Sequence, residues 1–162
     1  MIKIEIKDQD VLTMLSRLQA GMKDMRPAMA NVAQALASES ERQFATQSGP
    51  FGAWPGLSSA TTIPFRTKKG TWPGRILDVS SGGLAASVQT SYGADFARIG
   101  SNKPYSAMQM FGGTTSSTSM IPGKKIPARP YLPFNPQTKD LTPQAKATVL
   151  EVLETYFGQL TS

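Results

Sequence analysis

The side chains of this sequence that could carry out catalysis are serines and carboxylates. A serine nucleophile needs a base, and because the chain contains no histidine, that base would have to be a lysine. The segment SSGGLAAS at residues 80–87 lacks the G-x-S-x-G spacing of a nucleophile elbow. GTWPGR at residues 70–75 lacks the Gly-Lys-Ser/Thr ending of a phosphate-binding loop. Neither segment therefore predicts covalent catalysis or nucleotide binding.

The carboxylates form no recognisable metal-binding or glycosidase pattern. The candidates are Asp78, Asp95, Asp140, Glu151 and Glu154. Glu151 and Glu154 are three residues apart and share a helix face, a spacing typical of solvated surface charge. Cysteine is absent as well as histidine, which excludes disulfides, thiol nucleophiles and Cys/His zinc sites. The sequence predicts a protein that is not an enzyme and that uses no cofactor and no metal.

The composition predicts one domain, spanning residues 1–162. It also predicts that part of the surface of this domain is covered by neighbouring protein subunits. Of the 162 residues, 40% are apolar and only 17% are charged. No apolar run is long enough to cross a membrane. The net charge of +6 comes from scattered basic residues, with two denser groups: Arg66, Lys68, Lys69 and Arg75, then Lys124, Lys125 and Arg129. Solvated loop charge is the simpler interpretation, and non-specific nucleic-acid binding stays open as an alternative.

Residues 1–47 predict a strand and two helices. The alternation in MIKIEIK predicts a strand over residues 2–6. A helix capped by Asp8 or Asp10 should follow and end at Gly21. Its apolar stripe consists of Val11, Leu12, Leu15 and Leu18. The longest helix should run from Pro27 to Gln47, since proline is tolerated in a first turn. Its buried side consists of Met29, Val32, Leu36 and Phe44.

The rest of the chain predicts a loop at 48–75, a β half at 76–136 and a C-terminal helix at 137–162. In the β half, AASVQTS (85–91) and DFARIG (95–100) should form a hairpin. KPYSAMQMFGG (103–113) should form a short helix closed by glycine, and 114–125 a polar loop. Thr142 should cap the last helix, whose apolar face consists of Val149, Leu150, Leu153 and Phe157. The fold class is α+β, a small mostly antiparallel sheet packed by the long helix and the C-terminal helix, with long loops that order against partners.

The segment IPARPYLPFN at residues 126–135 has a proline at every third position. Such a segment is stiff and is expected as a polyproline II stretch or an edge strand, because proline cannot donate to an inner ladder. It is either anchored in the core by Tyr131, Leu132 and Phe134, or it is an assembly contact or a proline-rich ligand. Arg129 can pin it by a bidentate bond to a carboxylate or to carbonyls, within its own subunit or across an interface. Trp54 is either a lid over the long helix or an interface anchor.

Four motifs in order carry a family resemblance. They are WPGLS at 54–58, ILDVSSGGLAAS at 76–87, IGSNKPYSAMQMFGG at 99–113 and IPARPYL at 126–132. Together they resemble the phage virion morphogenesis family, the Mu-type tail-completion proteins of tailed bacteriophages. One departure is that Gln109 and Met110 stand where the family often has histidine and glutamine.

The resemblance implies a structural protein of the virion, present in the host cytoplasm during assembly and located at the neck or tail top. It would complete the tail or join it to the head connector, because related neck proteins form rings, commonly hexameric, around the DNA path. Its implied partners are itself, a tail tube or tail terminator protein, and a head connector or stopper protein, with DNA passing through unrecognised. A tail terminator role for the chain itself and a peptide-binding adaptor are alternatives. The candidate assembly residues are Trp54, Trp72, Tyr105, Gln109, Phe111, Arg129 and Tyr131.

Overall fold

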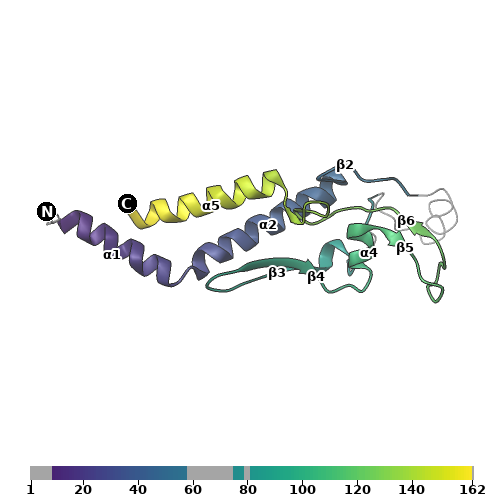
Figure 1. The fold of residues 1–162 in the computed structure, drawn as a ribbon, viewed down its shortest axis with the longest axis horizontal. Coiled ribbons are helices and arrows are strands. Elements are labelled where there is room, and N and C mark those ends of the chain that lie inside the picture. Colours follow the sequence, from purple (N-terminus) through teal and green to yellow (C-terminus); the bar gives the residue numbers. More distant parts are fainter. Residues whose placement is uncertain (1–8, 58–74, 79–80, 162) are drawn as a thin grey trace.

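The computed structural model describes residues 9–57, 75–78 and 81–161. Within these ranges the molecule is elongated (Figure 1). Helix α1 (Gln9–Lys23) and the last turns of α5 (Pro143–Thr161) lie at one end, and the chain around residues 113–126 lies at the other. The strand predicted at residues 2–6 and the candidate Trp72 lie outside the described residues.

Helix α2 (Arg26–Thr46) is the central element, and it confirms the longest predicted helix. Pro27 lies in its first turn, where the missing N–H would have no intrahelical acceptor. The helix ends at Gln47, whose φ of 51° places it in the left-handed region typical of a helix C-terminus. Its buried face consists of Ala28, Val32, Ala33, Leu36, Ser40, Gln43 and Phe44. The periodicity of the sequence predicted Val32, Leu36 and Phe44 correctly. Met29 was wrongly placed in this face, because it is only half-buried and Ala28 takes the buried position.

Helix α5 packs along α2 and begins with the predicted cap. The hydroxyl of Thr142 accepts a hydrogen bond from the backbone N–H of Ala145 at 3.2 Å. Ala145 is fully buried against Val32 and Leu36 of α2, and Val149, Val152 and Leu153 complete this cluster. The prediction that Leu150 belongs to the apolar contact face is wrong, because Val152 takes the inward position and Leu150 is 59% exposed.

Helix α1 confirms the first predicted helix but not its end. The helix continues through Gly21 to Lys23. Gly21 instead allows α5 to come close, since a Cβ there would lie 2.3 Å from Cδ1 of Leu160. The backbone oxygen of Gly21 also accepts a hydrogen bond from the Tyr156 hydroxyl at 3.4 Å. Helix α1 has no buried residue, so it rests on α5 without entering a core.

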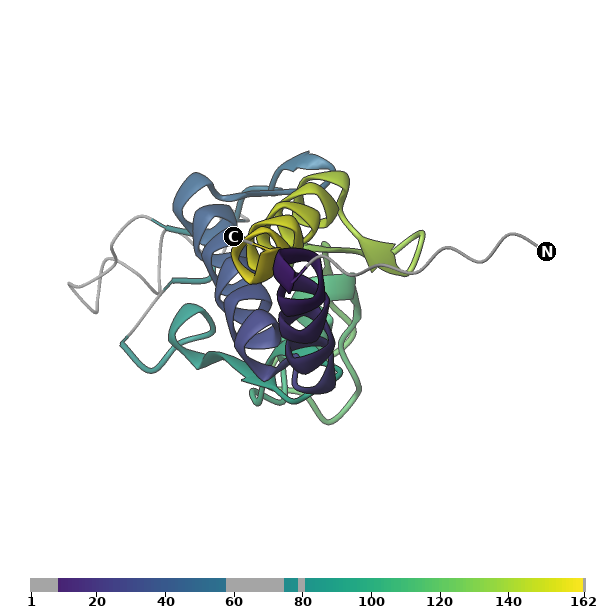
Figure 2. The ribbon, with the colours of Figure 1, turned by 90° about the vertical axis from the view of Figure 1, so that its left-hand side faces the viewer.

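The strands confirm an α+β fold, but within the described residues they form four separate two-stranded antiparallel ladders instead of one sheet. The longest pairs β3 (Val88–Tyr92) with β4 (Ala97–Ser101), as the predicted hairpin requires. The short helix is α4 (Ser106–Phe111), close to its predicted place, whereas residues 85–87 form a 3-10 turn and not the start of a strand. Figure 2 shows the three long helices together, with the β3–β4 ribbon on the other side of α2.

Three shorter ladders correct the loop predictions. Strands β1 (Ser48–Gly49) and β2 (Gly52–Ala53) form a tight hairpin at the start of the expected 48–75 loop. Strands β5 (Gly113–Thr114) and β6 (Lys125–Ile126) close the stretch 114–125 into a hairpin, whose turn is held by its own hydrogen bonds. Strand β7 (Phe134–Asn135) pairs with β8 (Asp140–Leu141) just before α5.

Candidate assembly interface

Trp54 lies in the core as a lid over α2, as one of its two predicted placements requires. Its side chain is 6% exposed, and its ring meets the ring of Phe44 edge-on with centroids 5.6 Å apart. Its indole Nε1 donates a hydrogen bond to the backbone oxygen of Pro130 at 2.8 Å. Gly49 makes room for this bond, because a Cβ there would lie 2.6 Å from the same oxygen. The buried tryptophan therefore joins α2 to the proline-rich segment.

Arg129 pins the proline-rich segment within its own subunit. The side chain is 5% exposed, and its Nε and Nη2 donate to the backbone oxygens of Pro55 and Gly56 at 2.8 and 2.9 Å. The planar guanidinium fits two successive carbonyls, which a lysine ammonium would not. Because a buried charge without acceptors is costly, these two bonds are needed for the fold. The same residue's backbone N–H donates to the backbone oxygen of Gln109 at 2.7 Å, which ties the segment to α4.

Tyr131 completes this core. It is 2% exposed, its ring centroid lies 5.4 Å from that of Phe44, and its backbone oxygen accepts a hydrogen bond from the Ser40 hydroxyl at 2.7 Å. Burial raises the pKa of its phenol, and hydrogen bonding with Ser106 and Ser101 partly opposes that shift. The segment IPARPYLPFN is thus anchored in the core, with its carbonyls bonded to groups from α2 and Trp54. An assembly role for Trp54, Arg129 and Tyr131 stays a prediction.

Helix α4 brings the remaining described candidates together near the surface. Tyr105 is 44% exposed and Phe111 is 56% exposed, whereas the neighbouring Met110 is 3% exposed and belongs to the core. Gly112 has a φ of 70°, and a Cβ there would lie 2.7 Å from the backbone nitrogen of Ala128. The side-chain oxygen of Gln109 is buried without a hydrogen-bond partner in the described part of the chain. Among the described candidate residues, only Tyr105 and Phe111 therefore present large apolar surface to solvent.

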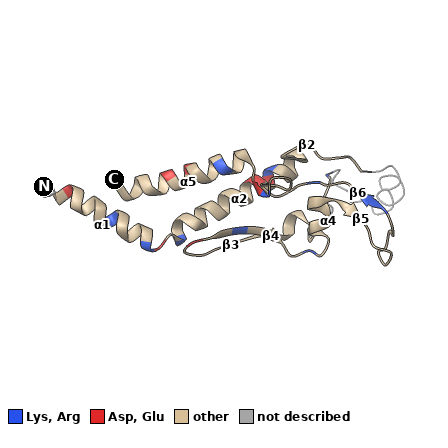
Figure 3. Ribbon diagram, in the orientation of Figure 1, with Lys and Arg blue, Asp and Glu red and all other residues tan. Residues whose placement is uncertain are grey.

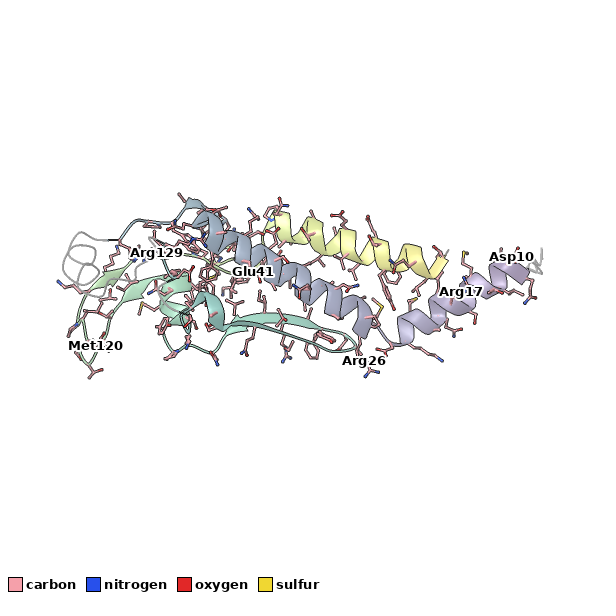
Figure 4. All side chains as sticks on the ribbon, turned by 180° about the vertical axis from the view of Figure 1, so that it is seen from behind. Asp10, Arg17, Arg26, Glu41, Met120 and Arg129 are labelled. Atoms are coloured by element: carbon pink, nitrogen blue, oxygen red, sulfur yellow. The ribbon has the colours of Figure 1, made fainter. Side chains whose placement is uncertain are left out.

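The largest uncovered apolar residues include several that the sequence had not marked as candidates. On α1 they are Leu12, Leu15 and Met22, which are 44%, 47% and 66% exposed. At the β5–β6 turn they are Met120 and Ile121, and on α5 there is Leu150. A signal for α1 was present in its sequence, because its apolar positions are more numerous than one helix contact can cover. Phe51, Tyr92 and Phe96 are exposed as well. Figure 4 shows Met120 close to the end of the molecule opposite Asp10 of α1.

The described residues offer no catalytic or metal-binding arrangement. Among them, no three acidic side chains come together in a way that could hold a metal ion. Of two open depressions, one of ≈ 380 Å³ lies along α1 next to Thr161, and one of ≈ 270 Å³ lies between α5 and Asn31 of α2. Both have mixed polar and apolar linings. No helix in the described ranges is long and apolar enough to span a membrane. Of the two basic groups, Lys124 and Lys125 are exposed on the β5–β6 hairpin and Arg75 lies 3.9 Å from Asp78, while the other three residues of the first group lie outside the described ranges.

Comparison with known proteins identifies the family. The model of the phage virion morphogenesis family matches residues 6–158. The Mu-like prophage FluMu G protein 2 of Haemophilus influenzae is 30% identical over 161 residues, covering 99% of each chain. Protein G of Escherichia phage Mu, for which a role in capsid assembly has been put forward, is 39% identical over 106 residues, covering 62% of this chain and 64% of its own. No solved structure is significantly similar to the chain. The chain therefore belongs to the phage virion morphogenesis family and has a structural or assembly role in the phage.

Proposed function

We propose that the protein is a structural subunit of the phage head–tail junction. It assembles as a ring, of six copies by analogy with related neck proteins, and completes the tail or joins it to the head connector around the DNA channel. The observation that carries this proposal is the contrast between a well-bonded core around Trp54 and the large apolar side chains left uncovered on α1, on α5 and at the β5–β6 turn.

Uncovered apolar side chains on several separate elements fit a repeating assembly better than a monomer. Soluble monomers rarely expose large contiguous apolar patches, and such patches mark protein contacts. When the two contacting surfaces of a subunit differ, each copy binds the next head to tail, and the series closes into a ring when the rotation allows it. The faces of such a ring would then contact a tail tube or tail terminator protein on one side and a head connector or stopper protein on the other.

A phage lacking the gene tests the role. We expect filled heads and separate tails in the lysate, and full particles when the gene is supplied in trans. The protein itself should be found in purified wild-type particles at a small fixed copy number, by quantitative mass spectrometry. Normal joined particles without the gene product, or particles that lack the protein, would refute the proposal.

Two other functions give different results. If the chain is itself the tail terminator, the deletion gives tails of uncontrolled length instead of tails of normal length that fail to join. If it acts by binding nucleic acid, the free protein binds DNA tightly, with an affinity that falls steeply as salt is added. Electron microscopy of the lysate and a salt titration therefore separate all three.

A further inference from the structure

The geometry points to a contact between copies of this chain, in which the β5–β6 hairpin of one copy docks on the exposed face of α5 of the next. This inference rests on the proposed ring, and it names the two surfaces that would close it. The contact pairs an apolar tip carrying two lysines with an apolar helix face carrying two glutamates.

The hairpin presents an apolar tip on an ordered turn. Met120 is 99% exposed and Ile121 is 52% exposed. The turn is nevertheless closed by hydrogen bonds around Thr115, whose hydroxyl accepts from the backbone N–H of Lys124 at 2.9 Å and donates to the backbone oxygen of Ile121. The backbone N–H of Gly123 donates to the oxygen of Thr115 at 3.1 Å. Because the turn is already ordered, docking it loses less conformational entropy than ordering a free loop would.

The α5 surface offers the complementary face. Leu150 is 59% exposed, and Glu151 and Glu154 are both exposed beside it. Glu154 is four residues from Leu150 and lies on the same side of the helix. Glu151 is next to Leu150 in the chain and borders the depression that α5 shares with Asn31 of α2. The other side of the helix carries Ala145 and Val152, which pack against α2. The face around Leu150 therefore has no role within the subunit in the described part of the chain.

The charges of the two surfaces are opposite. Lys124 and Lys125 are exposed on the hairpin, and the two glutamates are exposed on α5 (Figure 3). None of these four side chains has an ion-pair partner within the described residues of its own subunit. Complementary charge around an apolar contact sets its register and speeds association.

The uncovered face of α1 is a poorer receptor for this hairpin. That helix carries one acidic residue, Asp10, and two basic residues, Arg17 and Lys23. Its net positive charge would repel the lysines beside Met120. The difference in charge therefore favours α5 over α1 as the helix that binds the hairpin.

The two surfaces lie far apart on one molecule, and in the proposed ring the contact between them is heterologous. Figure 4 shows Met120 near the end of the molecule opposite Asp10, and α5 runs along the half that contains α1 (Figure 1). A copy cannot satisfy its own hairpin with its own α5 face, so each copy must bind the next. Although one hairpin contact is small, a closed ring repeats it and holds each copy at two sites.

Disulfide trapping in phage particles tests the contact directly. The chain has no cysteine, so the substitutions introduce its only thiols. Particles assembled with the double variant Met120→Cys and Leu150→Cys should, after mild oxidation, give a ladder of covalent oligomers on a non-reducing gel. Each single variant should give no ladder. The double variant Met120→Cys and Leu15→Cys is the matched control, and a ladder from that control alone would place the hairpin on α1 and overturn the inference.

Charge reversal gives an independent readout. Lys124→Glu with Lys125→Glu should lower incorporation into particles by about tenfold or more, because like charges would then face each other. Adding Glu151→Lys and Glu154→Lys to the same chain should restore it. Thermal melting of each purified variant identifies any loss caused by misfolding, since all four positions are exposed.

The outcomes separate this inference from the proposed function. If wild-type rings are present in particles but neither trapping nor charge reversal has an effect, the inference is wrong and the proposed function stands. If the wild-type protein is absent from particles or is monomeric in them, both are wrong. The contact would be established if the Met120→Cys and Leu150→Cys variant forms covalent oligomers and if Glu151→Lys with Glu154→Lys restores the incorporation of the lysine-to-glutamate variant into particles.

Discussion

The core around Trp54 and the helix α1 use similar apolar side chains in opposite ways. In the core, Trp54, Tyr131 and Met110 are each at most 6% exposed. In α1 no residue is buried, and Leu12 and Leu15 are nearly half exposed. The spacing of apolar residues along a helix therefore does not show whether they are buried in the core or stay exposed on the surface.

Polar groups make the difference between the two regions. Around the core, the indole of Trp54, the guanidinium of Arg129 and the hydroxyl of Ser40 all donate to backbone oxygens of distant segments. Such bonds fix geometry, because a buried group left without its partner is costly. One polar contact between α1 and α5 is the long 3.4 Å hydrogen bond from the Tyr156 hydroxyl to the backbone oxygen of Gly21. We conclude that buried polar bonds mark the part of the molecule that must be complete before assembly.

Replacing Trp54 should have the largest effect on folding. Trp54→Ala removes a buried ring and an indole donor, and it should lower the free energy of unfolding by about 3–5 kcal/mol. Urea denaturation of the purified subunit measures this. Leu15→Ala in α1 is the matched control and should change the free energy of unfolding by about 0.5 kcal/mol or less, as expected for an exposed position. Equal losses in the two variants would remove the distinction between the regions.

Removing Arg129 should have the second largest effect. Arg129→Ala leaves the oxygens of Pro55 and Gly56 without their donor, so the free energy of unfolding should fall by about 1–3 kcal/mol. Arg129→Lys keeps the positive charge but lacks the two parallel N–H donors of the guanidinium. It should therefore recover less than half of the free energy of unfolding that Arg129→Ala loses. The melting temperature of the monomer reports this. A monomer of unchanged stability that fails to assemble would instead assign the arginine to an interface.

The elements that sequence could predict are those fixed by local rules. Helix α2 follows from its apolar periodicity and Pro27, and the start of α5 follows from the Thr142 cap, because each signal lies within one turn of the element that it defines. The β3–β4 hairpin follows from two short runs separated by a turn. These elements account for the correct α+β fold class.

The remaining features depend on contacts between distant segments, which periodicity does not encode. Nothing near Arg129 in the sequence identifies Pro55 and Gly56 as its acceptors. The β5–β6 hairpin was missed because two paired residues per strand give no alternating pattern, and its closure depends on the hydroxyl of Thr115. Leu150 was misplaced because Val149, Leu150, Val152 and Leu153 span more of α5 than its contact with α2 covers.

The titration of Tyr131 should give a smaller effect, confined to alkaline pH. Because burial raises the pKa of this phenol above its ordinary value of 10.0, the folded state keeps its proton when the unfolded state begins to lose it. Its contribution is therefore constant below about pH 10 and is lost as the pH rises further. Tyr131→Phe should show a shallower fall in the free energy of unfolding between about pH 9 and 11 than the wild type.

The smallest effect on folding should come from the uncovered face of α1, although assembly should fail. Leu12→Gln, Leu15→Gln and Met22→Gln keep good helix formers at exposed positions, so each should change the free energy of unfolding by about 0.5 kcal/mol or less. If this face contacts another subunit or a neck protein, the triple variant should fold normally and yet be missing from particles, because the apolar contact is replaced by amides that bind water. Val11→Gln is the matched control, since Val11 is half-buried on the same helix and its loss should loosen α1 itself. Denaturation curves and the protein content of purified particles measure the two properties separately. Normal incorporation of the triple variant would show that α1 is uncovered without being an assembly surface, and the contrast with the core would then concern stability alone.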